Sequence, residues 1–133
     1  PLALEGALKL KEAARIFAEG LSAGELRHGP ISLIEREVPT IFILPTEEDA
    51  MQDTYVLMEE AASENAMVIA ITHEYDKTAE KITPHVIKVP YTQSKWIQAI
   101  LRVIPLQFLA YYAGTLRGVN PDKPKKLKKY VVL

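Results

Sequence analysis

Three short apolar runs, set among longer helix-forming segments, most strongly constrain how this 133-residue chain can fold. They are Thr40–Leu44, Met67–Ile71 and Val86–Val89. The first two show no alternation of apolar and polar residues, which is typical of strands that are covered on both faces of a parallel sheet. The third run is shorter, and we expect it nearer an edge. A polar loop is expected between the second and third runs, so the order helix, strand, helix, strand, strand, helix predicts an α/β fold with a parallel sheet and crossover helices.

The first two helical segments are predicted from composition and capping. Residues Leu4–Phe17 are mostly Ala, Leu, Lys and Glu, which favour one long helix. A second helix is expected to begin after Thr46, a good N-cap residue, and to run to about Ser63. Its first turn carries three acidic residues, Glu47, Glu48 and Asp49.

A third helix is predicted over Trp96–Leu116, with a stop at Gly118. Pro105 is expected to kink or split it. The segment is apolar enough to raise the question of a membrane span. Its polar residues and its proline argue against one, because each would be costly in hydrocarbon: Gln98, Arg102, Pro105 and Gln107.

The composition limits the chemistry. The formal net charge is −1, so nothing in the overall balance indicates nucleic acid or a membrane surface as a partner. There is no cysteine, which excludes a cysteine nucleophile and cysteine metal ligands and fits a reducing, cytoplasmic setting. The three histidines lack the spacing of metal ligands, and no cofactor or metal is expected.

An acid–base–acid stripe is predicted on the opening helix. Glu5, Lys9 and Glu12 follow one another at i, i+4 and i+7, so their side chains share one side. One interpretation is a solvated face with weak helix-stabilising pairs. The other is a proton-transfer site, in which Lys9 would lower the carboxylate pKa values while burial would raise them.

Two segments carry a resemblance to a known family. EGALKLKE at residues 5–12 and AGELRHGP at residues 23–30 resemble the second sugar-isomerase (SIS) domain of the glutamine–fructose-6-phosphate aminotransferases, also called glucosamine-6-phosphate synthases. The chain departs from that pattern in the second segment, with Arg27 for lysine. The segments at residues 104–107 and 122–124 are similar as well, so the resemblance runs nearly end to end.

The resemblance implies a three-layer α/β/α domain with a five-stranded parallel sheet. The first helix begins almost at once, so the strand that should precede Leu2 is expected to be missing. We therefore interpret residues 1–133 as a partial C-terminal SIS domain, in an excised, processed or incomplete form. Residues 119–133 would be its catalytic tail.

The resemblance also implies roles for individual residues. Glu12 would move the carbon-bound proton, with Glu5 and Lys9 lining the sugar site. His28 would open the sugar ring and would reach the site of a neighbouring subunit, which implies a homodimer. Lys129 would form an imine with the sugar, although Lys128 and Tyr130 depart from the family tail. The alternatives are a surface residue for Glu12, a helix-end cap for His28 and a solvated basic tail for Lys129.

Three functions remain open at this point. The first is the isomerase part of an aminotransferase that makes glucosamine-6-phosphate from fructose-6-phosphate and ammonia derived from glutamine. The others are a two-SIS-domain glucosamine-6-phosphate deaminase and a non-catalytic regulator that binds a phosphosugar. In the first, a preceding SIS domain would hold the phosphate, because the acidic turn after Thr46 would repel it, and a glutaminase domain would supply ammonia. We expect the 133-residue piece alone to be inactive.

Overall fold

The computed structural model describes residues 1–123, and these form two compact units. The first unit contains Pro1–Gly20 and the described residues from Val103 onward. The second unit contains Leu21–Arg102. Lys129 and most of the predicted catalytic tail lie outside the described residues.

A parallel sheet organises the second unit. Its strands are β1 (Thr40–Ile43), β2 (Val68–His73) and β3 (His85–Val89), in the order β1-β2-β3. Both strand pairs are parallel, and Phe42, Ala70 and Val86 lie side by side across the sheet. The predicted α/β class, the three strands and the edge position of β3 within this described sheet are confirmed.

Apolar residues on both faces explain why the strands do not alternate. On one face, Phe42 and Ala70 join a core that includes Met58 and Leu57 of the next helix. On the other face, the register aligns isoleucines: Ile41 with Ile69, and Ile43 with Ile71 and Ile87. A strand with apolar residues on each face has no hydrophilic side to show in its sequence.

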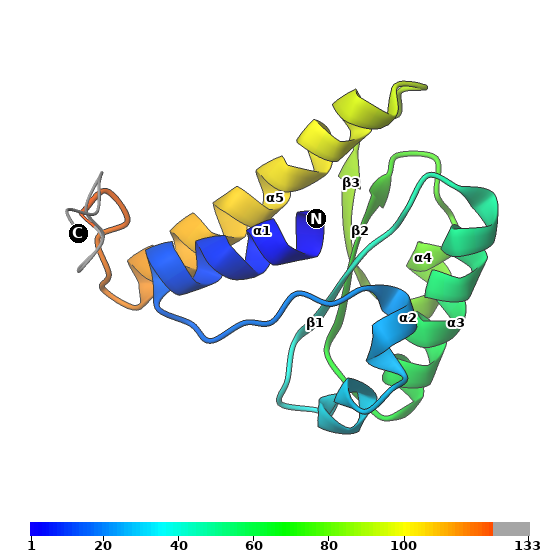
Figure 1. Ribbon diagram of the computed structural model, residues 1–133, viewed down its shortest axis with the longest axis horizontal. Helices are drawn as coiled ribbons and strands as arrows, with labels where there is room; N and C mark the ends of the chain where they lie inside the picture. The colour runs from blue at the N-terminus through cyan, green and yellow to red at the C-terminus, as the bar shows by residue number, and fades with distance from the viewer. Residues whose placement is uncertain (124–133) are drawn as a thin grey trace, which may run out of the picture. The chain divides into compact units, whose positions relative to one another are not determined.

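Helices α3 (Glu48–Ser63) and α4 (Ala79–Ile82) cover one face of this sheet (Figure 1). The predicted N-cap of α3 was wrong: Glu47 occupies that position, and the Thr46 hydroxyl instead donates to the Glu47 carboxylate at 3.2 Å. The short α4 was not predicted, because its residues lie in a polar segment without helical periodicity. Ahead of β1, the chain forms α2 (Ala23–Leu26) and a 3-10 turn, η2 (Pro30–Leu33).

Asp76 fixes the connection between β2 and α4. Its carboxylate accepts hydrogen bonds from the Thr72 hydroxyl at 2.7 Å and from the backbone N–H groups of Thr78 and Ala79. Burial alone would raise the pKa of Asp76, but these hydrogen bonds outweigh it and hold the pKa below the usual value. The charged carboxylate therefore serves as a cap for α4.

In the first unit, α1 (Leu2–Lys9) continues directly into a π-helical turn, η1 (Leu10–Ala14). The predicted helix over Leu4–Phe17 is thus correct in type but ends earlier, because Arg15 adopts a left-handed conformation with φ of 53°. Phe17, expected within that helix, lies beyond its end and is 89% exposed.

Helix α5 (Lys95–Leu116) begins in the second unit, and its residues from Val103 belong to the first. Pro105 was predicted to kink or split this helix, and it does not split it: α5 is continuous across the proline. Proline removes only one backbone donor, and Leu106 and Ala110, both buried, anchor the turns that follow. The predicted stop is confirmed: Gly118 has φ of +69°, and Val119 N donates to Gly114 O at 2.9 Å, as in a Schellman motif.

Two glycines allow α1 and η1 to pack closely on the part of α5 that belongs to the same unit. A Cβ on Gly6 would lie 3.1 Å from the Leu106 side chain, and one on Gly114 would lie 2.4 Å from Ala13 O. The backbone at Ala13, next to Glu12, therefore rests directly on α5.

By length and composition alone, α5 could span a membrane, a test that the core helix of a soluble protein also passes. Its polar residues Gln98 and Arg102 are 1% and 4% exposed. Burial lowers the pKa of Arg102, and the Glu47 carboxylate opposes that shift.

Candidate functional site

The predicted stripe is an ion-paired cluster in the first unit. The Lys9 ammonium donates to the Glu12 carboxylate at 2.7 Å and lies 3.7 Å from the Glu5 carboxylate. All three side chains are about one-third exposed, at 33%, 39% and 30% for Lys9, Glu5 and Glu12. The structure therefore brings together three of the predicted site residues in a position that solvent can reach.

The electrostatics of the cluster centre on Lys9. The hydrogen bond to Glu12 raises the pKa of Lys9, and partial burial acts in the opposite direction. Lys9 is consequently a fixed cation near neutral pH, shared between two carboxylates. Such exposed pairs stabilise a fold by only a few tenths of a kcal/mol, so stability alone gives little reason for this arrangement.

The π-helical turn that carries Glu12 was not predicted. A π turn widens the helix by one residue and is frequent at functional sites. Here it spans Leu10–Ala14, and Ile16 N closes it with a hydrogen bond to Leu10 O at 3.1 Å. Gly114, which admits the Ala13 carbonyl, is a sequence feature that this packing requires, and it lies about a hundred residues away along the chain.

His28 lies in the second unit, just after α2, and is exposed. Its backbone N–H donates to Glu25 O at 3.1 Å, and the following Gly29 has φ of +133°, which glycine tolerates best. Arg27 ties this segment to α3 through a 2.7 Å hydrogen bond to Glu60. The joint action of His28 with the stripe stays a prediction, as does the role of Lys129.

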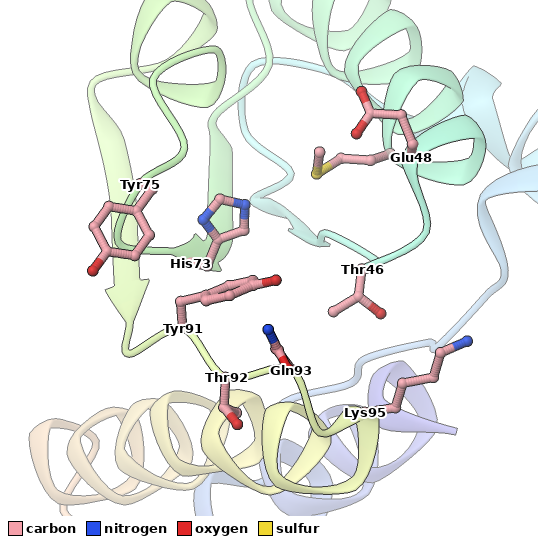
Figure 2. A pocket seen from close by; sticks show the side chains of 9 residues that line it. Thr46, Glu48, His73, Tyr75, Tyr91, Thr92, Gln93 and Lys95 are labelled. Atoms are coloured by element: carbon pink, nitrogen blue, oxygen red, sulfur yellow. The ribbon is translucent and has the colours of Figure 1, made fainter.

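A pocket of about 480 Å³ lies in the second unit, where the carboxyl ends of the strands meet (Figure 2). Its walls come from the residues that follow β1, from the end of β2, and from the connection between β3 and α5. The lining residues are Thr46, Glu48, Met51, His73, Tyr75, Tyr91, Thr92, Gln93 and Lys95. Ligands of open parallel sheets bind at this edge, so the strand order could have predicted the place, though not the side chains.

The pocket is a poor phosphate site. Hydrogen bonds from Lys95 and from backbone and hydroxyl donors lower the pKa of Glu47 to about 2, so this carboxylate is charged throughout the physiological range. Its 2.7 Å ion pair occupies the ammonium of Lys95, the one lysine of the lining. Among residues 1–123, no group of three His, Asp or Glu side chains is placed to hold a metal ion.

Comparison with known proteins shows which family this chain is similar to. Residues 1–117 match the SIS domain family. The chain is 44% identical over 133 residues to the glutamine–fructose-6-phosphate aminotransferase (isomerizing) of Chlorobaculum tepidum, and 43% identical over 135 residues to that of Thermococcus kodakarensis. Each alignment covers 100% of this chain and 21% of the relative, so the chain spans about a fifth of their length.

Two solved structures are also similar. The C-terminal domain of glucosamine-fructose-6-phosphate aminotransferase from Francisella tularensis has a TM-score of 0.78 and 28% identity, over 91% of this chain and 34% of that one. Glucosamine-6-phosphate deaminase from Thermotoga maritima has a TM-score of 0.75 and 32% identity, over 99% of this chain and 37% of that one. The resemblance predicted from residues 5–12 and 23–30 is confirmed: this chain belongs to the SIS domain family.

Proposed function

We propose that this chain is the C-terminal isomerase part of a glutamine–fructose-6-phosphate aminotransferase. The reaction consumes fructose-6-phosphate and glutamine and yields glucosamine-6-phosphate and glutamate. The Lys129 amine forms an imine at the C2 ketone with loss of water, ammonia released from glutamine displaces the lysine from C2, and a proton moves from C1 to C2. The SIS part performs the isomerisation.

The observation that carries the proposal is the Glu5–Lys9–Glu12 cluster. A carboxylate that moves a proton between adjacent carbons must be held in one place and must be reachable from solvent. Glu12 satisfies both conditions, because Lys9 holds it at 2.7 Å and it is 30% exposed. The 44% and 43% sequence identity to two aminotransferases, along the whole of this chain, supports the same conclusion.

Each residue has a proposed task in this reaction. Glu12 takes the proton from C1 and returns it to C2. Lys9 keeps Glu12 oriented through their hydrogen bond, and Glu5 and Lys9 hydrogen-bond the sugar hydroxyls. His28 gives and takes the proton at the ring oxygen, for which an imidazole is suited near neutral pH. Lys129, which lies outside the described residues, forms the imine.

The remaining components would come from other parts of the protein. A preceding SIS domain would bind the phosphate, since the turn at Glu47, Glu48 and Asp49 would repel it, and a glutaminase domain would supply ammonia. His28 would serve the site of a second subunit in a homodimer. We place this enzyme in the cytoplasm, where its phosphosugar substrate is made.

The test is Glu12→Gln in the natively expressed protein. Turnover should fall by about two or more decades, the scale of general acid–base catalysis, with the KM for fructose-6-phosphate little changed. Exchange of the C1 proton with deuterated solvent should fall in parallel. Glu19→Gln, an exposed residue of the same unit, is the matched control. Turnover of the Glu12 variant within threefold of wild type would remove Glu12 from the mechanism.

The similarity to the Thermotoga maritima deaminase favours a second candidate, hydrolysis of glucosamine-6-phosphate to fructose-6-phosphate and ammonia. Both reactions use the same proton transfer, so Glu12→Gln should abolish either. The requirement for glutamine distinguishes the two reactions. The aminotransferase releases one glutamate for each glucosamine-6-phosphate formed, and the deaminase acts without glutamine. If wild-type protein catalyses neither reaction, a non-catalytic phosphosugar regulator becomes the better interpretation.

A further inference from the structure

The pocket at the carboxyl edge of the sheet is a second place where this chain can bind a small molecule. At about 480 Å³ it is within the size range of small-ligand sites. Its lining contains neither the stripe residues nor His28. It lies wholly within the second unit and does not depend on the proposed function.

Three aromatic rings form one wall of this pocket. The ring centroids of His73 and Tyr91 are 5.5 Å apart, and Tyr75 is 6.1 Å from Tyr91 and 6.5 Å from His73. Their planes are mutually tilted by 49° to 72°, so the rings present faces in several directions. Tyr75 and Tyr91 are 69% and 50% exposed, an unusual state for rings that only fill a core. Figure 2 shows this wall opposite Thr46 and Lys95.

The charges around the rings are mostly negative. Glu48 lines the pocket, Asp49 flanks it in sequence, and Glu74 accepts a hydrogen bond from Tyr91 N at 3.1 Å. Lys95 is already paired with Glu47. Aromatic faces and carboxylates both attract cations, and both disfavour anions such as phosphate.

We propose that this pocket binds a small organic cation whose ammonium group sits against the faces of Tyr75 and Tyr91, near the Glu48 carboxylate. The hydroxyls of Thr46 and Thr92 and the amide of Gln93 supply hydrogen bonds for the rest of the molecule. Uncharged molecules of the same size should bind more weakly, because they gain neither the cation–π attraction nor the attraction of the carboxylates.

The test compares choline with 3,3-dimethylbutan-1-ol, a neutral molecule of the same shape, by calorimetry on the natively expressed protein. Choline should bind saturably, with a Kd of about 1 mM, and at least about tenfold more tightly than the alcohol. Added salt should weaken choline binding and leave alcohol binding unchanged. Inorganic phosphate should not compete.

Substitutions inside and outside the pocket test whether choline binds there. Tyr91→Leu and Glu48→Gln should each weaken choline binding about three- to tenfold, and Tyr91→Phe should restore it because the ring remains. Tyr111→Leu and Glu64→Gln, exposed residues outside the pocket, should leave it unchanged. Circular dichroism confirms that each variant is folded. Equal binding of choline and the alcohol, unchanged binding in the Tyr91→Leu variant, or no saturable choline binding would each overturn the proposal.

Discussion

The stripe in the first unit and the pocket in the second are built by different means. Glu5, Lys9 and Glu12 lie within eight residues of one another, and a single helical segment aligns them. The pocket draws its nine residues from three stretches between Thr46 and Lys95, which only the parallel sheet brings together. The comparison shows that local periodicity can place charged groups, whereas a concave site requires topology. The predictions below separate the two regions by their response to substitution.

The largest effect is expected in the second unit, at Asp76. Asp76→Ala removes three hydrogen bonds to a buried carboxylate, and two of them come from the backbone N–H groups of Thr78 and Ala79, where α4 begins. The free energy of unfolding should fall by about 2–4 kcal/mol, since hydrogen bonds to charged groups each contribute about 1.5–3 kcal/mol. Urea denaturation measures it, with the exposed Asp49→Ala as control. A loss no larger than in that control would contradict the capping role.

The stripe should respond in activity rather than in stability. Lys9→Met leaves the Glu12 carboxylate without its 2.7 Å partner. We expect turnover to fall by about 10- to 100-fold, because a small displacement of a reacting group has a large effect on rate. The free energy of unfolding should change by less than about 1 kcal/mol, as for other exposed ion pairs. Lys95→Met, which breaks the ion pair beside the pocket, is the control and should keep turnover near wild type.

Gly114→Ala tests whether the packing of α5 on η1 positions Glu12. The new Cβ would lie 2.4 Å from Ala13 O, so the backbone next to Glu12 must move. We expect a loss of about 1–3 kcal/mol in stability, typical of overpacking, together with lower turnover in the folded fraction. Gly24→Ala is the matched control, since nothing lies within 4 Å of its added Cβ. Wild-type turnover in a destabilised Gly114→Ala protein would show that Glu12 is placed without α5.

The smallest effects concern the pH dependence of stability, which should have opposite signs at Lys9 in the first unit and at Asp76 in the second. The pKa of Lys9 is raised from 10.5, so its contribution to stability is complete below that value and is lost as pH rises further. The pKa of Asp76 is lowered from 3.8, so its contribution is complete above that value and is lost as pH falls. The stability difference between wild type and Lys9→Met, a few tenths of a kcal/mol, should vanish in strong alkali.

The matching comparison for Asp76 uses Asp76→Asn. Its stability difference from wild type should shrink as the solution is acidified below pH 3.8, measured by urea unfolding across the pH series. A difference that stayed constant down to strong acid would mean that the charge of Asp76 is not what the capping hydrogen bonds require.

The sequence by itself determined the elements that depend on local pattern. The apolar runs at Thr40–Leu44 and Met67–Ile71 predicted buried strands, because residues on both faces are apolar. Gly118 predicted the end of α5, because a left-handed C-terminal residue favours glycine. Helical spacing put Glu5, Lys9 and Glu12 on one side, and the motifs around them predicted the family.

Only the tertiary structure decided the features that depend on distant residues. Pro105 remains inside α5 because buried neighbours on later turns outweigh one missing hydrogen bond. The π turn at Leu10–Ala14 packs where Gly114 lets the Ala13 carbonyl approach, a contact across a hundred residues. The pocket at the carboxyl edge exists because parallel pairing brings the ends of β1, β2 and β3 to one side. Sequence patterns record the preferences of neighbours along the chain, and these three features are set by neighbours in space.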